Sequence, residues 1–452
     1  MTAADELGRY FATVGPDAFP AGKLHDMRRL LLDYFGVALS GSQSESGRAA
    51  ARVMTGLGGA PQSTVIGYGV RVSAPDAAFA NAVSEHSIEL DDIDVVALFH
   101  YGPPIVSAAL AVAEWRGATG AELLAAMLCG CETMNRVSLA CNPALRNRGF
   151  HTTPTAGVFG AAVAAGRLLG LSGDQLVSAL GLAGAQASGL MEMYGPSMQK
   201  RVNPGPAARN GITAALLARE GFTGADTIFE GERGFGNAFA GGIDLSKMLD
   251  GLTDTITTDV EYKPYSAARP IHNSIDAALA LREAGVTADT VKSLVIARHP
   301  DWAHYHLNRR PATFHEAQVS LPYSTAIALI DGGALPPQYA GSQLSRPGVL
   351  ALIDTMTVET DPALPRGVSC RLTATLADGS TVIRQVDDPR GSLANPLSDK
   401  DLEGKFTMLA SPVLSAGGAE RLATAIWSTD ALDDVGELLS LAAPAEVPGH
   451  AA

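Results

Sequence analysis

The 452-residue sequence is poor in cysteine and has no long hydrophobic run. The spacing of its four cysteines matches neither a zinc motif nor a disulfide framework. Cys129 and Cys131 lie in the apolar run LLAAMLCGCETM, so we expect buried free thiols in a reducing compartment. No run of about 18 apolar residues is free of charge, so no membrane span is expected. The N-terminal residues MTAADELGRYF carry no export signal, and the predicted location is cytoplasmic.

Positive charge is also scarce, because 33 Lys and Arg residues stand against 47 Asp and Glu residues and give a formal net charge of -14. A nucleic-acid partner would require a basic face, and this balance argues against one. A small anionic ligand is compatible with the composition, because its site needs only local positive charge. Aromatic residues make up 6% of the chain, which disfavours an all-helical prenyl-diphosphate enzyme with an aromatic-lined cavity.

The length exceeds that of one ordinary hydrophobic core, so two domains are expected. Apolar residues recur at helical spacing in KLHDMRRLLLDYFGVALS, TAGVFGAAVAAGRLLGL and PAARNGITAALLARE, and Ala/Gly-rich runs of this kind indicate closely packed helices. Ser172, followed by Gln175, predicts the N-cap of a further helix. Roughly the first 260 residues are therefore predicted to be mostly helical.

The sequence changes character after Lys263. VKSLVIARHP and TMTVETD favour strands, and RLTATLADGSTVIRQV predicts a hairpin that turns at Asp378-Gly379. The predicted fold class is mainly α with a smaller α+β domain. The helical domain takes the two ends of the chain, the α+β domain lies between them, and a loose tail follows. The predicted ranges are 1–262 and 391–440 for the helical domain, 263–390 for the α+β domain and 441–452 for the tail.

The stretch HSIELDDIDVVALFHYGPP places four carboxylates between two histidines, in a region of small apolar residues. The acids are Glu89, Asp91, Asp92 and Asp94, and the histidines are His86 and His100. Such a cluster costs charge repulsion and desolvation if it is buried. It could bind a divalent cation, but its spacing matches neither an EF-hand nor a DDxxD motif, and we favour no dedicated metal site. For Asp94 we favour a solvated loop that caps a helix starting near Pro103.

Four further segments place cations or imidazoles beside glycine, proline or small residues. They are GFHTTPTAG, SMQKRVNPGPAARNG, YKPYSAARPIHNS and RHPDWAHYHLNRR. In an acidic protein, basic groups at loop-to-helix junctions are what a carboxylate-rich substrate would require. A single one of these groups is more simply explained as a surface ion pair, whereas the set as a whole predicts an anion site.

In their order and spacing, these segments resemble the MmgE/PrpD family, which includes 2-methylcitrate dehydratase, cis-aconitate decarboxylase and iminodisuccinate epimerase. HSIELDDID is similar to the family's His-x-x-acid-Phe-Asp-Asp-(Thr/Ser) signature. The family pattern is also followed by GFHTTPTAGVFGAAVAAGRLLGL, SMQKRVNPGPAARNGITAALLAREGFTG, YKPYSAARPIHNSIDAALAL, AQVSLPYSTAIALIDG and NPLSDKDLEGKF. The resemblance therefore runs nearly from end to end.

The resemblance implies a large helical domain with both termini, a smaller α+β lid domain and a homodimer. It also implies catalysis in a cleft between the domains, on a small anionic carboxylate, with no metal and no organic cofactor. The positions that match catalytic residues are Glu89, His100, His151, Lys200 and Lys263. The positions assigned to substrate binding are Asp91, Asp92, Arg201, Arg269, His272 and Tyr323. For Tyr323, as for Tyr194, a place in the core is the alternative.

The sequence departs from the family pattern in the signature. The first acid, usually Asp, is Glu89, and the hydroxyl residue after Asp-Asp is Ile93, whose side chain can neither donate nor accept a hydrogen bond. The segment that leads to His100 is one residue longer than in the decarboxylase. The loss of the hydroxyl strengthens the case for the family's epimerase chemistry.

The chemistries of the family share one step, in which a proton or carbon dioxide leaves a carbon beside a carboxylate. The resulting negative charge requires cations or hydrogen-bond donors, for which Lys200, Lys263 and Arg269 are candidates. His100 or His151 would supply the acid or base, because imidazole titrates near neutrality. The first hypothesis is a cofactor-independent lyase, with dehydration or hydration ahead of decarboxylation. An epimerase or isomerase is the alternative, and a non-catalytic ligand-binding homologue is the second alternative.

Overall fold

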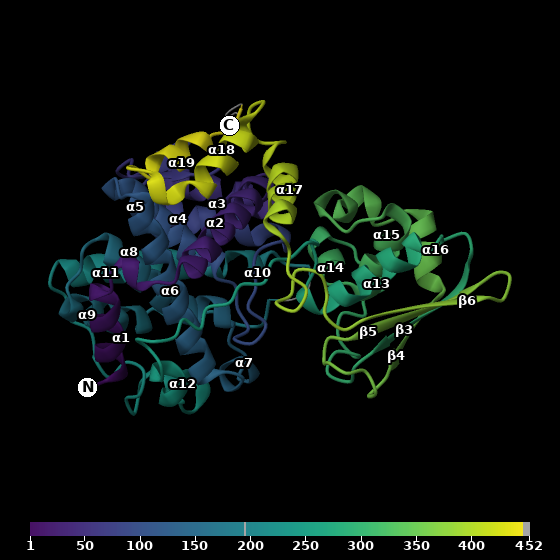
Figure 1. Ribbon diagram of the computed structural model, residues 1–452, viewed down its shortest axis with the longest axis horizontal. Coiled ribbons are helices and arrows are strands. Elements are labelled where there is room, and N and C mark those ends of the chain that lie inside the picture. Colours follow the sequence, from purple (N-terminus) through teal and green to yellow (C-terminus); the bar gives the residue numbers. More distant parts are fainter. Residues whose placement is uncertain (194–195, 446–452) are drawn as a thin grey trace. The chain divides into compact units, whose positions relative to one another are not determined.

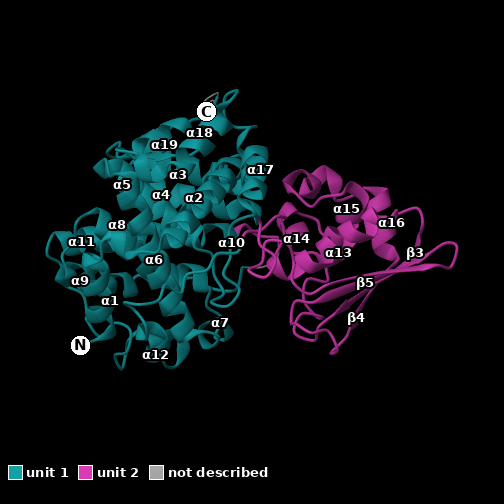
Figure 2. Cartoon of the chain, in the orientation of Figure 1, with its two compact units in different colours: residues 1–193, 199–261, 398–452 teal, residues 194–198, 262–397 magenta. Residues whose placement is uncertain are grey.

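The computed structural model describes residues 1–193 and 196–445 (Figure 1). The chain forms two compact units (Figure 2), of which unit 1 comprises residues 1–193, 199–261 and 398–452, and unit 2 comprises residues 194–198 and 262–397. Most of the chain is helical and one small mixed sheet is present, so the predicted fold class is confirmed. Tyr194 and residues 446–452 of the predicted tail lie outside the described residues.

Unit 1 is built almost entirely from helices. Before the chain enters unit 2, they are α1 (Ala3–Thr13), α2 (Ala21–Ser42), α3 (Glu45–Leu57), α4 (Ala74–Glu85), α5 (Ser107–Arg116), α6 (Gly120–Cys141), α7 (Ala144–Asn147), α8 (Thr152–Leu168), α9 (Gly173–Gly184), α10 (Gln199–Val202), α11 (Pro204–Arg219) and α12 (Leu245–Leu249). After unit 2 come α17 (Asp399–Ala410), α18 (Gly418–Trp427) and α19 (Gly436–Leu441). A short antiparallel hairpin joins β1 (Ser63–Val65) to β2 (Val70–Val72).

Small residues allow the central helices of unit 1 to pack closely. α8 contacts both α6 and α11, and its residues 152–166 are all buried. A Cβ on Gly160 of α8 would lie 2.4 Å from the carbonyl oxygen of Gly130 in α6, so this helix crossing requires glycine. The predicted N-cap is confirmed, because the Ser172 side chain accepts the backbone N–H of Gln175 at the start of α9.

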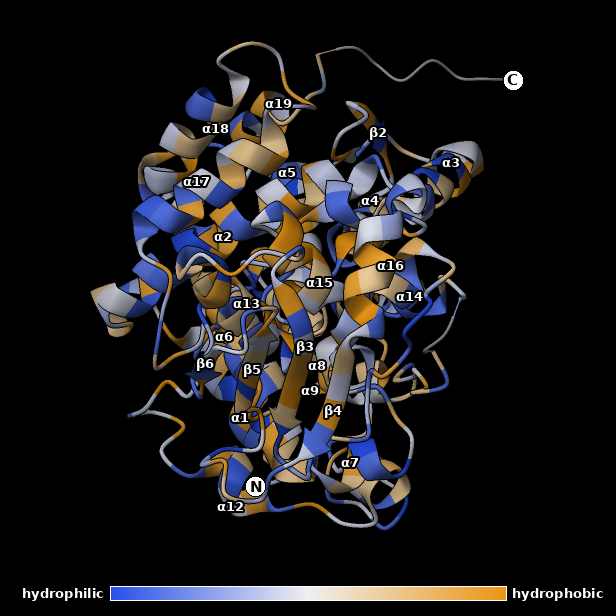
Figure 3. Cartoon of the chain, turned by 90° about the vertical axis from the view of Figure 1, so that its right-hand side faces the viewer, coloured by the Kyte–Doolittle hydropathy of each residue, from blue (hydrophilic) through white to orange (hydrophobic). Residues whose placement is uncertain are grey.

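Unit 2 combines a four-stranded sheet with helices. Its strands are β3 (Val291–Arg298), β4 (Met356–Thr360), β5 (Cys370–Leu376) and β6 (Thr381–Val386), and its helices are α13 (His272–Glu283), α14 (Phe314–Gln318), α15 (Leu321–Asp331) and α16 (Pro347–Asp354). The strand order is β4-β3-β5-β6, with β3 parallel to β4 and the other pairs antiparallel. The predicted hairpin is the β5–β6 pair. Figure 3 shows the hydrophobic run along α16, whose Val349, Leu352 and Ile353 belong to the core of this unit.

Two expectations from composition can be compared with the structure. Among the described residues, no helix is both long enough and apolar enough to cross a membrane. Cys129 and Cys131 are buried free thiols, as predicted. Burial raises the pKa of the Cys129 thiol to about 12, so this thiol is not reactive at neutral pH.

Candidate active site

Residues 86–102, here called the acid loop, lead from the end of α4 toward α5. The carboxyl group of Asp92 shapes this loop, because it accepts the backbone N–H groups of Tyr101 and Gly102 at 2.8 Å each. Position 102 requires glycine, since a Cβ there would lie 2.8 Å from side-chain oxygens of both Asp92 and Glu85. Asp92 therefore fixes the end of the loop that follows His100.

Asp91 and Asp92 were assigned to substrate binding from the sequence, but both are completely buried. Burial, and then the neighbouring charge of Asp91, raises the pKa of Asp92 to about 8. This raised pKa favours the protonated form of Asp92 near neutral pH, and protonation relieves part of the charge repulsion expected in this cluster. The bonds of both residues lie within the protein, and we interpret them as positioning residues.

Glu89 holds two cations in a buried ion cluster. Its backbone adopts the left-handed conformation, with φ of 56°, at the end of the short helical turn of residues 86–88. Lys200 Nζ lies 2.5 Å from each carboxylate oxygen of Glu89, and Arg201 Nη1 also bonds to this carboxylate. Arg201 donates a second hydrogen bond to the carbonyl oxygen of His86 at 3.2 Å. Lys200 and Arg201, both predicted from the sequence, are thus held together beside the acid loop.

Asp91 lies between two histidines of the acid loop. Its Oδ2 is 2.6 Å from Nδ1 of His86 and 3.0 Å from Nδ1 of His100, and the two imidazole centroids are 4.9 Å apart. Nδ1 of His100 also lies 2.5 Å from the carbonyl oxygen of Asp92. Within the part of the chain that the structure describes, the buried Nε2 of His86 has no hydrogen-bond partner. Sequence analysis did not select His86, although it opens the signature motif.

These three residues could be read as a metal site, since one potential ligand atom from each of His86, Asp91 and His100 lies within 4.8 Å of the others. Their hydrogen bonds favour a different interpretation. The carbonyl oxygen of Asp92 can only accept, so Nδ1 of His100 carries a proton, and Nδ1 of His86 donates to the carboxylate. In the neutral rings these two Nδ1 atoms hold protons and offer no lone pair to a metal ion, so we treat their contacts with Asp91 and Asp92 as hydrogen bonds.

His151 lies at the start of α8, near the acid loop. The backbone N–H of His100 donates to Oγ1 of Thr153 at 3.2 Å, and the imidazole centroids of His86 and His151 are 6.1 Å apart. Nδ1 of His151 is 3.0 Å from Nδ2 of Asn203. Burial, followed by the nearby His86 and Lys200, lowers the pKa of His151 well below its usual range. His151 is therefore neutral at physiological pH.

The expectation of a solvated Asp94 is wrong, because this residue is only 7% exposed. Its Oδ1 accepts the backbone N–H groups of Val96 and Ala97 at 2.9 and 2.7 Å, and its Oδ2 accepts the Tyr101 hydroxyl at 2.9 Å. Asp94 therefore closes a tight turn within the acid loop. Tertiary contact with the Tyr101 hydroxyl, which no sequence pattern reveals, accounts for its burial.

Lys405 is a second residue that sequence analysis missed. It projects from α17, beyond unit 2 in the chain, and its Nζ lies 2.6 Å from both Oδ1 of Asp33 and the carbonyl oxygen of Leu90. The C-terminal part of unit 1 thereby anchors the acid loop between Glu89 and Asp91. The segment NPLSDKDLEGKF contributed to the resemblance, but nothing in it indicated a contact with the loop.

Four predicted site residues belong to unit 2. Lys263 is completely buried. Nη1 of Arg269 lies 3.3 Å from Nδ1 of His272, whose Nε2 donates to the carbonyl oxygen of Ala267 at 2.9 Å. Both ring nitrogens of His272 therefore have protein partners, which favours a positioning role over substrate binding. The Tyr323 hydroxyl donates to the carbonyl oxygen of Gln338 at 2.7 Å inside the core of unit 2, as the alternative for this residue expected.

Residues 298–310 of unit 2, here called the basic segment, use their charges differently. Arg298 is 1% exposed and donates to the carbonyl oxygens of Trp302, Tyr305 and Pro270 at 2.6, 3.1 and 2.8 Å. His304 is exposed. The basic segment thus folds around one arginine that satisfies backbone groups, and its histidines do not gather into a cluster like that of the acid loop.

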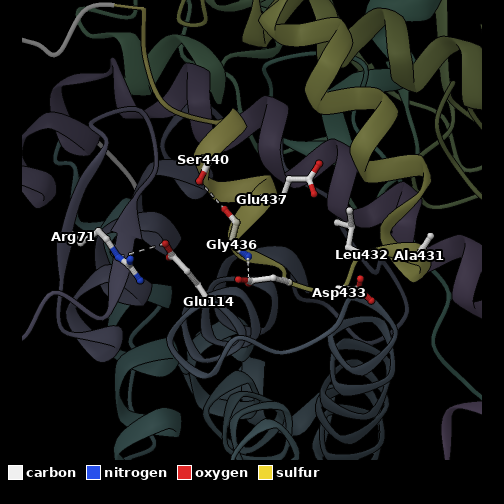
Figure 4. A pocket seen from close by; sticks show the side chains of 9 residues that line it. Arg71, Glu114, Ala431, Leu432, Asp433, Gly436, Glu437 and Ser440 are labelled. Atoms are coloured by element: carbon white, nitrogen blue, oxygen red, sulfur yellow. Dashed lines mark hydrogen bonds and ion pairs between the residues drawn. The ribbon is translucent and has the colours of Figure 1, made fainter.

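A pocket of about 540 Å³ lies elsewhere in unit 1, between Arg71, the end of α5 and residues 431–440 (Figure 4). Its buried carboxylate, Glu114, already accepts hydrogen bonds from Ser63 and Thr64. The remaining charged lining residues, apart from Arg71, are Asp433, Asp434 and Glu437. An acidic lining disfavours an anionic ligand, and the pocket shares no residue with the histidine cluster. The cluster around the acid loop is therefore the candidate site.

A mostly helical unit that holds buried histidines, an acid and two cations, joined to an α+β unit, defines the class of protein. Residues 5–247 match the MmgE/PrpD N-terminal domain and residues 265–431 match the MmgE/PrpD C-terminal domain. The chain belongs to the MmgE/PrpD family, which confirms the resemblance inferred from the sequence.

Several curated relatives carry related names. The chain is 31% identical to the cis-aconitate decarboxylase-like protein oryM of Aspergillus oryzae, over 96% of each chain. It is 30% identical to the cis-aconitate decarboxylase of Homo sapiens, over 92% of this chain and 89% of that protein. It is 26% identical to the cis-aconitate decarboxylase of Aspergillus terreus, over 96% of this chain and 95% of that protein. The similarity thus extends over both units.

Proposed function

We propose that this protein is a lyase that acts on a small di- or tricarboxylate through an intermediate with carbanion or enolate character. The observation that carries the proposal is the cluster in which Lys200 and Arg201 share the carboxylate of Glu89 beside the acid loop. Two cations are thereby concentrated at a buried place beside the acid loop, and such a place suits an anionic substrate. Family membership and the names of the relatives support this assignment.

In the proposed reaction, carbon dioxide leaves the substrate and the electron pair of the broken C–C bond stays on the substrate. A cation stabilises the negative charge most effectively in a site that excludes water. Lys200 is 8% exposed and is the first candidate for this role. One proton, delivered by an imidazole, then completes the product. Lys263 and Arg269 of unit 2 stay predictions based on the resemblance, as do the homodimer and the independence from metal and organic cofactors.

The relatives change the order of the hypotheses. Sequence analysis ranked dehydration or hydration ahead of decarboxylation, whereas the relatives are decarboxylases by name. We therefore propose decarboxylation of a cis-aconitate-like tricarboxylate first and dehydration second. One observation favours the epimerase alternative: Ile93 bonds through its backbone to Glu261, and its side chain offers no hydrogen bond to a substrate.

The test is proton NMR in deuterated buffer, with and without EDTA. The panel consists of cis-aconitate, citrate, methylcitrate, malate and aspartate-derived dicarboxylates. Decarboxylation predicts carbon dioxide and a product that carries one deuterium on the carbon that received the proton. Dehydration predicts a new vinylic signal from a hydroxy acid, and epimerisation predicts deuterium exchange without a change of connectivity.

The Lys200→Met variant is the matched negative control in this assay. If the protein converts a panel member equally well with and without EDTA, and the variant does not convert it, the result supports the lyase. Conversion that needs a metal overturns the cofactor-independent mechanism. If calorimetry detects binding of panel members and the assay detects no turnover, the hypothesis of a non-catalytic ligand-binding homologue replaces that of a lyase.

A further inference from the structure

His100 and His151 differ in the partners of their Nδ1 atoms. A neutral imidazole carries one proton, and the partner of one ring nitrogen decides which nitrogen holds it. A nitrogen that faces an acceptor must be protonated, and a nitrogen that faces a donor must offer its lone pair. The hydrogen bonds therefore assign the tautomer of His100 and that of His151.

Nδ1 of His100 faces two acceptors. The carbonyl oxygen of Asp92 lies at 2.5 Å and Oδ2 of Asp91 at 3.0 Å. Neither the carbonyl nor the carboxylate can donate, so the proton of neutral His100 is on Nδ1 and the lone pair is on Nε2. When Nε2 binds a second proton, the carboxylate of Asp91 stabilises the resulting imidazolium. His100 is thus built to gain and lose a proton.

Nδ1 of His151 instead faces the side-chain amide of Asn203. Nδ2 of Asn203 lies 3.0 Å from this nitrogen and 3.3 Å from the sulfur of Met193. Thioether sulfur only accepts hydrogen bonds, so the side of the amide that faces both groups is its NH2. The amide then donates to Nδ1, and the proton of His151 is on Nε2. No other hydrogen bond to this ring occurs within the described residues.

The surroundings keep His151 in this neutral form. The residue is 4% exposed, and the imidazole of His86 and the side chain of Lys200 lie near its ring. Burial is the main reason why its pKa lies well below the usual range. Among the residues that the structure describes, no carboxylate bonds to the ring of His151, in contrast to the ring of His100.

We propose that Asn203 is a positioning residue that holds His151 neutral with its proton on Nε2, so that His151 acts as a fixed hydrogen-bond donor while His100 carries the proton. This inference rests on the proposed function and gives the two histidines different roles in it. Neither the family match nor the names of the relatives assigns a role to Asn203.

The protonation states of His100 and His151 determine what each residue can do in the reaction. Neutral His151 cannot act as the proton source, because loss of its single N–H proton would leave an imidazolate. It can donate a hydrogen bond to a carboxylate or enolate oxygen, as neutral imidazoles do in other enzymes. Imidazolium His100 supplies the proton: its Nε2–H bond breaks and a C–H bond forms as carbon dioxide leaves. Neutral His100 then takes a proton from solvent, so the cycle is balanced.

The test is a long-range proton–nitrogen correlation spectrum of the full chain with 15N-labelled histidine, recorded at neutral pH without substrate. Protonated and unprotonated ring nitrogens resonate far apart, so the spectrum reports the tautomer of each of the ten histidines. Spectra of His151→Gln and His100→Gln assign the two signals. We expect an unprotonated Nδ1 for His151 and a protonated Nδ1 for His100. A protonated Nδ1 on His151 in the unaltered chain overturns the proposal.

Two variants and a control extend the test. Asn203→Asp replaces the donor by an acceptor, and we expect His151 to gain a proton at Nδ1 and turnover to fall about tenfold to a hundredfold, mainly in kcat. Asn203→Ala removes the donor, and a mixture of tautomers is expected. Asn237→Asp makes the same change at an exposed asparagine and should alter neither spectrum nor turnover. An unchanged His151 signal in Asn203→Asp refutes the positioning role.

Failure of this inference is distinguishable from failure of the proposed function. The tautomers are measured without a substrate, so they stand even if no tested carboxylate is converted. Conversely, if the protein decarboxylates a substrate but His100 and His151 have the opposite tautomers, the proposed lyase function stands and the positioning role of Asn203 is refuted.

Discussion

The acid loop of unit 1 and the basic segment of unit 2 are both rich in charged residues and histidines, yet they use them for different purposes. In the acid loop, Asp91 bonds to two histidines and Glu89 holds Lys200 and Arg201. In the basic segment, the buried Arg298 donates to three backbone carbonyls. The density of charged residues in a sequence therefore does not identify a site. What identifies it is whether ionisable groups face one another or face the backbone.

The largest effect is expected from Lys200→Met, which removes a cation from the carboxylate of Glu89. We expect turnover to fall by about a hundredfold to a thousandfold, because one electrostatic contact to the developing charge is lost. Lys247→Met on the exposed side of α12 is the matched control. A variant with near-normal turnover, measured by the NMR assay, would remove the ion cluster from the proposed mechanism.

The next effect is expected from Asp91→Asn, which keeps the shape of the side chain but removes its charge. The imidazolium of His100 loses its stabilising partner, and turnover should fall about tenfold to a hundredfold. Asp301→Asn is the matched control, since Oδ2 of Asp301 lies 3.2 Å from Nδ1 of His299 and the Asp301 side chain is mostly exposed. Equal losses in the two variants would erase the distinction between the acid loop and the basic segment.

In the basic segment, Arg298→Met should affect stability. It leaves three carbonyl oxygens without their donor, and we expect the free energy of unfolding to fall by about 2 kcal/mol in urea denaturation. Arg310→Met, at an exposed ion pair with Asp354, should change the unfolding free energy by less than about 1 kcal/mol. If Arg298→Met is as stable as the unaltered chain, the carbonyl contacts do not organise this segment.

Over a single pH unit, an effect of at most about 1.4 kcal/mol is expected from the titration of Asp92. Its folded pKa of about 8 lies above the ordinary value of 3.8, so between these values the folded state binds a proton that the unfolded state lacks. The free energy of unfolding should therefore fall as the pH rises from about 4 toward 8, and this contribution should level off above 8.

Urea denaturation at several pH values below and above 8 measures this slope. We expect Asp92→Asn to remove it, and Asp378→Asn in the exposed β5–β6 turn to preserve it. The same slope in Asp92→Asn and in the unaltered chain would mean that Asp92 is ionised in the fold.

The smallest effect is expected from His304→Ala in the basic segment. His304 is exposed, so turnover should not change and the free energy of unfolding should shift by less than about 0.5 kcal/mol. A loss of turnover beyond twofold, in the assay used for Lys200→Met, would show that the basic segment takes part in function after all.

Local patterns predicted much of the fold. The β5–β6 hairpin follows from alternating residues around Asp378-Gly379, and the start of α9 follows from Ser172 and Gln175. Short-range patterns suffice in these cases because the interacting residues are neighbours in the chain. Glu89 and Lys200 were selected through the resemblance, and Arg201 was selected as a basic group of SMQKRVNPGPAARNG. The structure brings the three residues together in unit 1.

Roles within the acid loop could not be predicted in the same way. Asp91, Asp92 and Asp94 appear equivalent in the sequence, but Asp91 bonds to histidines, Asp92 to backbone N–H groups and Asp94 to a turn and a tyrosine hydroxyl. Their partners lie at different places along the loop, so spacing carries no information about which acid is charged.

The sequence by itself determined the class of fold, the family and the set of ionisable residues, because helix periodicity, turn residues and motif order are properties of neighbouring positions. The tertiary structure alone decided which nitrogen of His100 and of His151 holds a proton, and that Lys405 of α17 anchors the acid loop. These properties depend on donors and acceptors that meet across long stretches of chain. Burial removes water as an alternative partner, so each such meeting fixes a protonation state that no local pattern encodes.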